Sequence, residues 1–166
     1  MSKLLALDQS SRITGWSIFE DGKLQQYGKF NAENAGTQIG KRLEYIRNKV
    51  KALIEENNIT EVVLEDIQMQ GNVVNNVQTF KTLAEVFGVI SELLVEMDIP
   101  QSAILASSWK SALGIRGRAR TEQKRNAQEW VFMKYSVKPT QDECDSICIG
   151  SCATKSSSNT KCAWAN

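Results

Sequence analysis

The sequence predicts a single α/β domain in which helices flank a five-stranded mixed sheet. The first thirty residues contain short apolar runs separated by turn residues, which is typical of strands. The apolar spacing then changes to three and four residues, as in amphipathic helices, and two further short strands follow. With 166 residues, of which 42% are hydrophobic, the chain is long enough to bury a core of its own.

The first three strands are expected to be antiparallel. Residues 3–7 form an apolar run, and residues 16–19 follow after a small polar turn. Asp21-Gly22 is a strong hairpin signal, so residues 23–30 should return as the third strand.

The remaining elements alternate between helix and strand. Apolar residues recur at helical spacing from about Thr37 to Asn57 and again over residues 75–97, where Pro100 ends the pattern. The fourth strand is Val62–Glu65 and the fifth is Ala103–Ala106. Two more helices are expected, around Glu122–Lys134 and from near Asp142.

The end of the chain divides into a packed helix and a tail. We expect residues 1–154 to form the domain and residues 155–166, rich in Ser, Asn and Lys, to be a loose tail. Cys144, Cys148 and Cys152 recur every four residues, which indicates a buried helix face rather than a metal site. Cys162 falls in the tail. Trp109 and Trp130 are interpreted as packing residues, although Trp109 beside Lys110 could approach a bound polymer.

Composition excludes several classes of protein. The chain has no histidine, so a Ser-His-Asp or Cys-His catalytic unit is excluded, as is a zinc site that needs imidazole. No apolar run approaches the length that spans a bilayer, and no signal peptide is recognisable. Cysteines confined to the last quarter do not form a secreted disulfide framework, so the expected compartment is the cytoplasm.

Carboxylates follow two of the predicted strands. Asp8 ends the first and Glu65 ends the fourth, and parallel neighbours would bring both to the ligand-binding edge of the sheet. Asp66 should point to the other face, so Glu65 is preferred. Asp142 and Asp145 share one face of the last helix at its first turn. Each could instead be a turn former or a helix cap, and the prediction rests on their joint placement.

Four converging carboxylates indicate a magnesium site. Hard oxygen ligands suit Mg²⁺, with Mn²⁺ able to substitute, and an unpaired carboxylate at a buried strand end such as Asp8 would otherwise be costly. Two such ions could clamp the attacking and leaving oxygens of a phosphodiester.

A basic cluster suggests the substrate. Six basic residues lie between positions 110 and 125, where an even distribution would place about two. Gly114 and Gly117 make this segment a flexible loop that could approach a phosphate backbone, although a solvated loop is the ordinary interpretation. The six are Lys110, Arg116, Arg118, Arg120, Lys124 and Arg125.

These motifs, in this order, resemble the RuvC family of Holliday junction resolvases. The resemblance rests on Asp8 with Thr14-Gly15, Glu65 after its strand, Lys110 before the glycine-containing loop, and Asp142-x-x-Asp145, and it covers nearly the whole chain. It implies an RNase H-like fold and a Mg²⁺-dependent homodimer that nicks branched DNA, leaving 5′-phosphate and 3′-hydroxyl ends. It also implies that the four carboxylates are metal ligands and that Lys110 lies near the cleaved backbone. The small size suggests a bacteriophage member.

The chain departs from the family pattern beside these residues. Gln9-Ser10 stands where Pro-Gly is usual, and Gln68-Met69 where a Phe often stacks on bases, so Gln68 is a further expected DNA contact. Thr121 aligns with a second lysine, for which Arg118, Arg120 or Lys124 could substitute. These departures leave the choice among four-way junctions, three-way forks and flaps open.

Three alternatives remain for comparison. Sugar-kinase and actin-like ATPases begin with a similar strand and hairpin but need two lobes, which 166 residues cannot supply. RNase H-like 3′–5′ exonucleases would show Asp-x-Glu, whereas position 10 is Ser. A non-catalytic branched-DNA-binding protein of the same fold is disfavoured because four carboxylates would weaken its affinity for DNA.

Overall fold

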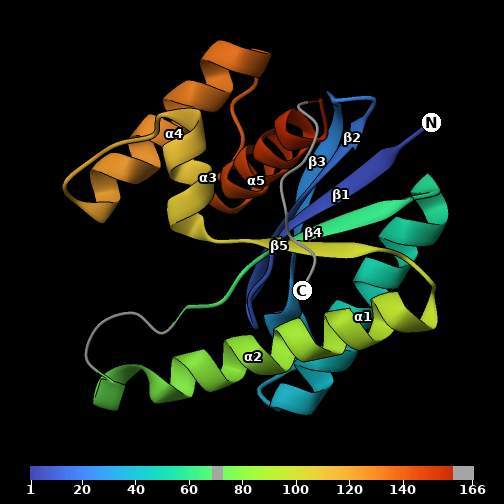
Figure 1. Ribbon diagram of the computed structural model, residues 1–166. Helices are drawn as coiled ribbons and strands as arrows, with labels where there is room; N and C mark the ends of the chain where they lie inside the picture. The colour runs from blue at the N-terminus through green and yellow to red at the C-terminus, as the bar shows by residue number, and fades with distance from the viewer. Residues whose placement is uncertain (69–72, 159–166) are drawn as a thin grey trace.

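The centre of the molecule is a mixed sheet with strand order β3-β2-β1-β4-β5. A computed structural model of the chain describes residues 1–68 and 73–158 (Figure 1). Strand β1 pairs antiparallel with β2 and parallel with β4, while β2–β3 is antiparallel and β4–β5 is parallel. The expected arrangement of three antiparallel strands plus two parallel ones is therefore confirmed. The strands are β1 (Lys3–Asp8), β2 (Ile13–Glu20), β3 (Lys23–Asn31), β4 (Glu61–Glu65) and β5 (Gln101–Ile104).

Helices cover both faces of this sheet. One face carries the first two long helices and the other carries the last three, so the molecule has three layers (Figure 1). A 3₁₀ turn, Ala32–Ala35, directly follows β3. The helices are α1 (Ile39–Asn57), α2 (Val73–Glu96), α3 (Ala106–Leu113), α4 (Arg120–Tyr135) and α5 (Gln141–Ser158). None of those described is long and apolar enough to cross a bilayer.

Alternation along β1 separates two hydrophobic cores. Leu5 and Leu7 belong to the core under α1 and α2, whereas Leu4 and Ala6 belong to the core under α3, α4 and α5. This is the period of two expected of a strand with both faces covered. Asp8 continues the Leu4–Ala6 set and so belongs to the α5 face.

Helix α5 lies directly on the sheet, and Gly150 allows this close approach. A Cβ on Gly150 would lie 2.2 Å from the Phe19 ring and 3.0 Å from the Ala6 Cβ. Cys144, Cys148 and Cys152 are buried on the same helix, which confirms the packing interpretation, while Cys162 lies outside the described residues. The helix continues to Ser158, so the expected tail beyond position 154 begins as helix, and its end is not among the described residues.

Two predicted elements need correction. The fifth strand is Gln101–Ile104 rather than Ala103–Ala106, because its parallel register with β4 runs from Val62↔Gln101 to Glu65↔Ile104. Residues 106–113 are helical, an element that we did not predict, and this helix ends at Gly114 in the left-handed conformation (φ 70°). Only residues 114–119 of the expected basic loop lie between α3 and α4.

Candidate active site

Two strand ends bring the first pair of carboxylates together. Strands β1 and β4 are parallel neighbours, paired from Leu4↔Glu61 to Leu7↔Leu64, so Asp8 and Glu65 extend from adjacent strand ends. Glu65 follows Val63 in the alternation, as Asp8 follows Ala6, and both Val63 and Ala6 belong to the core under α5. The two carboxylates therefore face the side of the sheet on which α5 lies.

The first turn of α5 contributes the other two carboxylates. The Thr140 backbone N–H donates to Glu143 Oε2 (2.7 Å), and the Thr140 hydroxyl donates to the same oxygen (2.8 Å). Thr140 therefore occupies the N-cap position and Glu143 accepts from it, so Asp142 and Asp145 are not used as caps. Asp145 accepts a hydrogen bond from Gln141 Nε2 (2.9 Å).

Gly15 determines how closely this turn approaches the sheet. It lies on β2 opposite Asp8, and a Cβ at this position would be 1.9 Å from the Asp142 carbonyl oxygen. The backbone of α5 therefore packs against β2 at the level of Asp8. All four carboxylates line one cleft of about 870 Å³.

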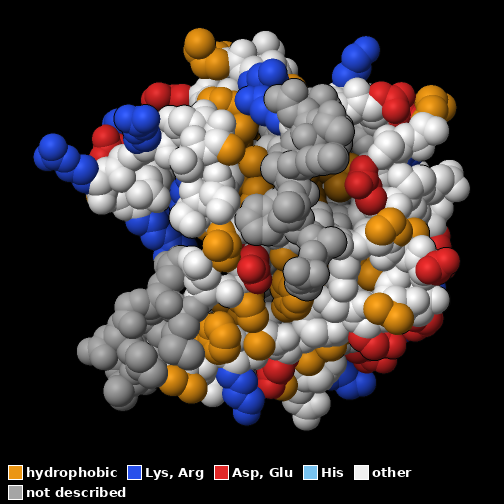
Figure 2. Space-filling view, viewed as in Figure 1, with side chains coloured by type: hydrophobic (Ala, Val, Ile, Leu, Met, Phe, Trp, Pro, Cys, Tyr) orange, Lys and Arg blue, Asp and Glu red, His pale blue; other side chains and the backbone are white. Residues whose placement is uncertain are grey.

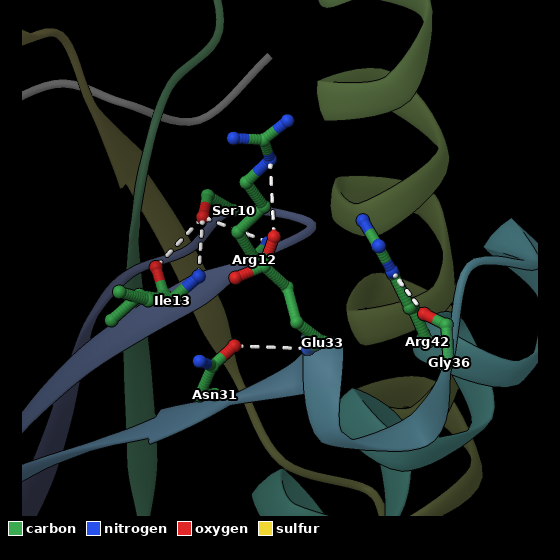
Figure 3. A network of polar contacts seen from close by, with 7 residues as sticks. All are labelled: Ser10, Arg12, Ile13, Asn31, Glu33, Gly36 and Arg42. Atoms are coloured by element: carbon green, nitrogen blue, oxygen red, sulfur yellow. Dashed lines mark hydrogen bonds and ion pairs between the residues drawn. The ribbon is translucent and has the colours of Figure 1, made fainter.

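The loop after Asp8 is held by hydrogen bonds of Ser10 and by an ion pair with the 3₁₀ turn (Figure 3). Ser10 Oγ accepts the Ile13 backbone N–H (3.1 Å) and donates to the Ile13 carbonyl oxygen (2.7 Å). Arg12 forms an ion pair with Glu33 (3.6 Å), and Asn31 Oδ1 accepts the Glu33 backbone N–H (2.9 Å). A turn built on Ser10 thus replaces the Pro-Gly turn that the resemblance leads one to expect.

Burial and mutual repulsion make these carboxylates difficult to ionise. Burial raises the pKa of Asp8 well above its usual value, and the charges of Glu65, Asp145 and Asp142 raise it further. Burial likewise raises the pKa values of Glu65 and Asp145, which hydrogen bonds from Trp109 and Gln141 partly offset. A cation bound among these carboxylates would favour their ionised forms and so lower these pKa values.

Basic side chains line the same cleft. Lys110 and Lys124 each oppose the charge of Asp145, and Arg120 opposes that of Glu65. Figure 2 shows Lys and Arg side chains gathered at the hollow under the beginning of α4, on the left of the view. Arg116 and Gln68 also line the cleft.

Two of the predicted DNA contacts lie outside this lining. Arg118 is exposed, and its backbone N–H donates to Glu122 Oε2 (2.9 Å). Arg125 is exposed and pairs with Glu129 (3.7 Å) on the surface of α4. Of the three basic residues considered as substitutes for a second lysine, Arg120 and Lys124 are the ones in the cleft.

The donor set fits a hard divalent cation. Four carboxylates line the cleft, and within residues 1–68 and 73–158 neither Asp8 nor Asp142 accepts a hydrogen bond or forms an ion pair through its side chain. In the same part of the chain, no three acidic or cysteine side chains are arranged to hold an ion as they stand. Small side-chain rotations would therefore have to accompany binding at this site.

Sequence reasoning missed three residues of the site. The Gln9 amide bonds the backbone of Glu65 at both its N–H and its C=O, Trp109 Nε1 donates to Glu65 Oε2 (2.9 Å), and Gln141 holds Asp145. The contacts to Glu65 join residues 56 and 44 positions apart, so no local pattern indicates them. The Thr140-x-x-Glu143 cap, in contrast, is a readable signature that we did not use.

Sequence comparison identifies related proteins. Residues 4–153 match the family model described as "Crossover junction endodeoxyribonuclease RuvC". A crossover junction endodeoxyribonuclease RuvC of Halorhodospira halophila is 25% identical over 154 residues, which cover 92% of this chain and 89% of the relative. The protein of the same name from Shewanella sediminis is also 25% identical, over 92% of this chain and 86% of its own.

Solved structures share the fold. A Thermus thermophilus RuvC in complex with a Holliday junction substrate has a TM-score of 0.69 at 14% identity, over 96% of this chain and 98% of its own. A fowlpox virus resolvase in complex with Holliday junction DNA has a TM-score of 0.60 at 13% identity, over 93% of this chain and 97% of its own. At these identities the likeness concerns the fold, which is the RNase H-like arrangement that we expected.

Proposed function

Since the chain belongs to the RuvC family of crossover junction endodeoxyribonucleases, we propose that it is a structure-selective endonuclease that cleaves branched DNA such as Holliday junctions. One observation carries the proposal: Asp8, Glu65, Asp142 and Asp145 line a cleft together with Lys110 and Lys124. A cleft of mixed charge suits a phosphodiester backbone in the presence of a divalent cation.

Family membership implies dependence on a divalent metal, and we propose Mg²⁺, with two ions held by the four carboxylates. Bound there, the ions would activate water and neutralise charge on the phosphate. The chain itself would supply positive charge beside the metal site. Lys110, whose Nζ donates to Gln123 Oε1 (3.3 Å), would offset charge on the scissile phosphate. The expected products carry 5′-phosphate and 3′-hydroxyl ends.

Recognition of DNA is proposed to rest on phosphate contacts around the cleft. Lys110, Arg116, Arg120 and Lys124 would bind the backbone near the cut, and Gln68 would meet the strand beside Glu65. Arg118 and Arg125, outside the cleft lining, would meet only the duplex arms beyond it. The two resolvases in complex with Holliday junctions support a four-way junction as substrate, and three-way forks and flaps remain substrates to be compared.

We also propose that the protein acts as a homodimer in the cytoplasm. Val77 and Val95 on α2 are 48% and 76% exposed, although α2 otherwise packs its apolar face on the sheet. These two valines are single exposed side chains rather than a contiguous apolar patch, so the proposed homodimer rests on the family resemblance.

Cleavage of matched linear, three-way and four-way DNA in Mg²⁺ tests the proposal. The wild type should nick the four-way junction, and Asp8→Asn should bind it without nicking. If the wild type binds the junction but never nicks it in Mg²⁺ or Mn²⁺, the protein is a branched-DNA-binding protein and the enzymatic proposal fails. Mapped strand ends would identify the products.

A further inference from the structure

Glu65 is held at two points by residues outside the carboxylate set. Its backbone is bonded by the Gln9 side chain and its carboxylate by the Trp109 indole. Gln9 and Trp109 come from the β1–β2 loop and from α3, which are separate elements packed around the end of β4.

The Gln9 amide extends the β1–β4 ladder by one pair. Backbone pairing between the strands reaches Leu7↔Leu64. Beyond it, the Gln9 amide nitrogen donates to the Glu65 carbonyl oxygen (2.6 Å), and the Glu65 backbone N–H donates to the Gln9 amide oxygen (3.2 Å). Gln9 is only 6% exposed, so water cannot easily replace these bonds. The side chain therefore fixes the separation of the strand ends that carry Asp8 and Glu65.

Trp109 fixes the Glu65 side chain itself. An indole N–H can only donate, and here it donates to Glu65 Oε2 at 2.9 Å. Trp109 is 1% exposed and packs in the same core as Ile147 and Cys148 of α5, so the ring cannot swing away. No donor within the described residues reaches Oε1, which leaves that oxygen for another ligand.

The same indole also contacts a cation of the cleft. Lys110 Nζ lies 5.2 Å from the centroid of the Trp109 ring, within the range of a cation–π contact. Trp109 thus contacts both Glu65 and Lys110 in the cleft. Core packing would explain the burial of its ring but not these two polar contacts.

We propose that Gln9 and Trp109 are positioning residues that preset Glu65 for a divalent cation, an inference that rests on the proposed function. Residues that hold a metal ligand in one orientation reduce its conformational freedom before the metal binds, so less entropy is lost on binding. Gln9 stands where the family pattern has proline, so its contact with Glu65 belongs to this chain's own sequence.

Trp109→Phe tests the indole hydrogen bond, with Trp130→Phe as the matched control. Phe keeps an aromatic ring in the core and removes the donor, whereas Trp130 lies on the same side of the sheet, packed on Tyr135. Binding of Mg²⁺ to the DNA-free proteins should weaken by about 10-fold or more in Trp109→Phe. In cleavage, kcat should fall by a similar factor with KM for the junction unchanged, and Trp130→Phe should match wild type in both measurements.

Gln9→Met tests the second contact with Trp109 still present. It keeps the length of the side chain, removes both bonds to the Glu65 backbone, and should weaken Mg²⁺ binding in the same direction. Folding of each variant is checked by circular dichroism, and an unfolded variant would be replaced in the test by the other. Wild-type affinity for Mg²⁺ in both folded variants, or an equal loss in Trp130→Phe, would overturn the inference. Because Mg²⁺ binding is measured without DNA, its result stands even if the wild type fails to cleave junctions.

Discussion

At the scale of single residues, Asp8 is a carboxylate in a position where its charge is unfavourable. It ends a buried strand, and burial and three neighbouring carboxylates raise its pKa. The charge of Lys124 opposes this rise, although no ion pair to Asp8 forms in the described part of the chain. An apolar or neutral residue would suit the metal-free fold better. The charge of Asp8 does not stabilise the metal-free fold, as expected if Asp8 holds the proposed cation.

Replacing Asp8 by Asn should separate activity from stability. We expect the nicking rate to fall by at least about 100-fold, as when one charge-stabilising group leaves an active site. The metal-free protein should gain roughly 0.5–2 kcal/mol in its free energy of unfolding, because a repelled carboxylate is removed. Urea unfolding in EDTA measures the gain. Asp21→Asn, the same change in the exposed β2–β3 turn, should alter neither quantity, and a destabilised Asp8→Asn would contradict the account.

The raised pKa values also set the sign of the pH dependence. Burial raises the pKa of Asp8, Glu65 and Asp145, so in the folded state these groups keep protons that the unfolded chain releases near pH 4. Their contribution to stability is complete below about pH 4 and is lost as pH rises through the raised values. Urea midpoints in EDTA should therefore fall with rising pH, and less steeply in Asp8→Asn. A metal-free stability that rises with pH above about pH 4 would contradict the raised pKa values.

At the scale of elements, the strands were predictable and the small elements were not. Asp8 and Glu65 were located because alternating apolar residues and carboxylates are local signals, and parallel pairing then placed their ends together. Helix α3 was missed because Ser107, Ser108 and Ser111 have modest helix propensity, and burial of Trp109 and Leu113 decides its structure. The residues that form β5 are determined by its register with β4, which no local sequence pattern indicates.

Gly15→Ala tests the contact between α5 and β2. The added Cβ would meet the Asp142 carbonyl oxygen at 1.9 Å, so the first turn of α5 would have to move. We expect a loss of about 1–3 kcal/mol in the free energy of unfolding, together with lower cleavage activity. Gly40→Ala is the control, because its Cβ meets no atom within 4 Å and alanine favours the helix by about 0.5 kcal/mol. A fully active Gly15→Ala would show that the position of α5 is not critical.

At the scale of the whole molecule, charge distribution matters more than net charge. The net charge of +1 conceals a cleft in which acidic strand ends and basic residues around α3 and α4 meet. The basic segment was visible in the sequence, but which of its members enter the cleft was not. Arg118 lies in the loop before α4 and Arg125 pairs with Glu129 on the surface of that helix, whereas Arg120 and Lys124 line the cleft.

Lys124→Gln should weaken junction binding in a salt-dependent way. If Lys124 contacts one phosphate, the slope of log affinity against log salt should decrease in magnitude by about one. Fluorescence anisotropy with a four-way junction in EDTA, across a salt series, measures the slope. Lys23→Gln, an exposed change at the beginning of β3, should leave it unchanged. An unchanged slope in Lys124→Gln would remove this residue from the DNA contacts.

Because the four carboxylates come from β1, β4 and α5, they converge only in the folded chain. A cation held by all four is bound by the native state and not by the unfolded one. Folding and ion occupancy are then linked: each tenfold rise in free ion concentration above the dissociation constant adds about 1.4 kcal/mol to the folding equilibrium. The ionic composition of the surroundings would thereby help to set the lifetime of the protein as well as its activity.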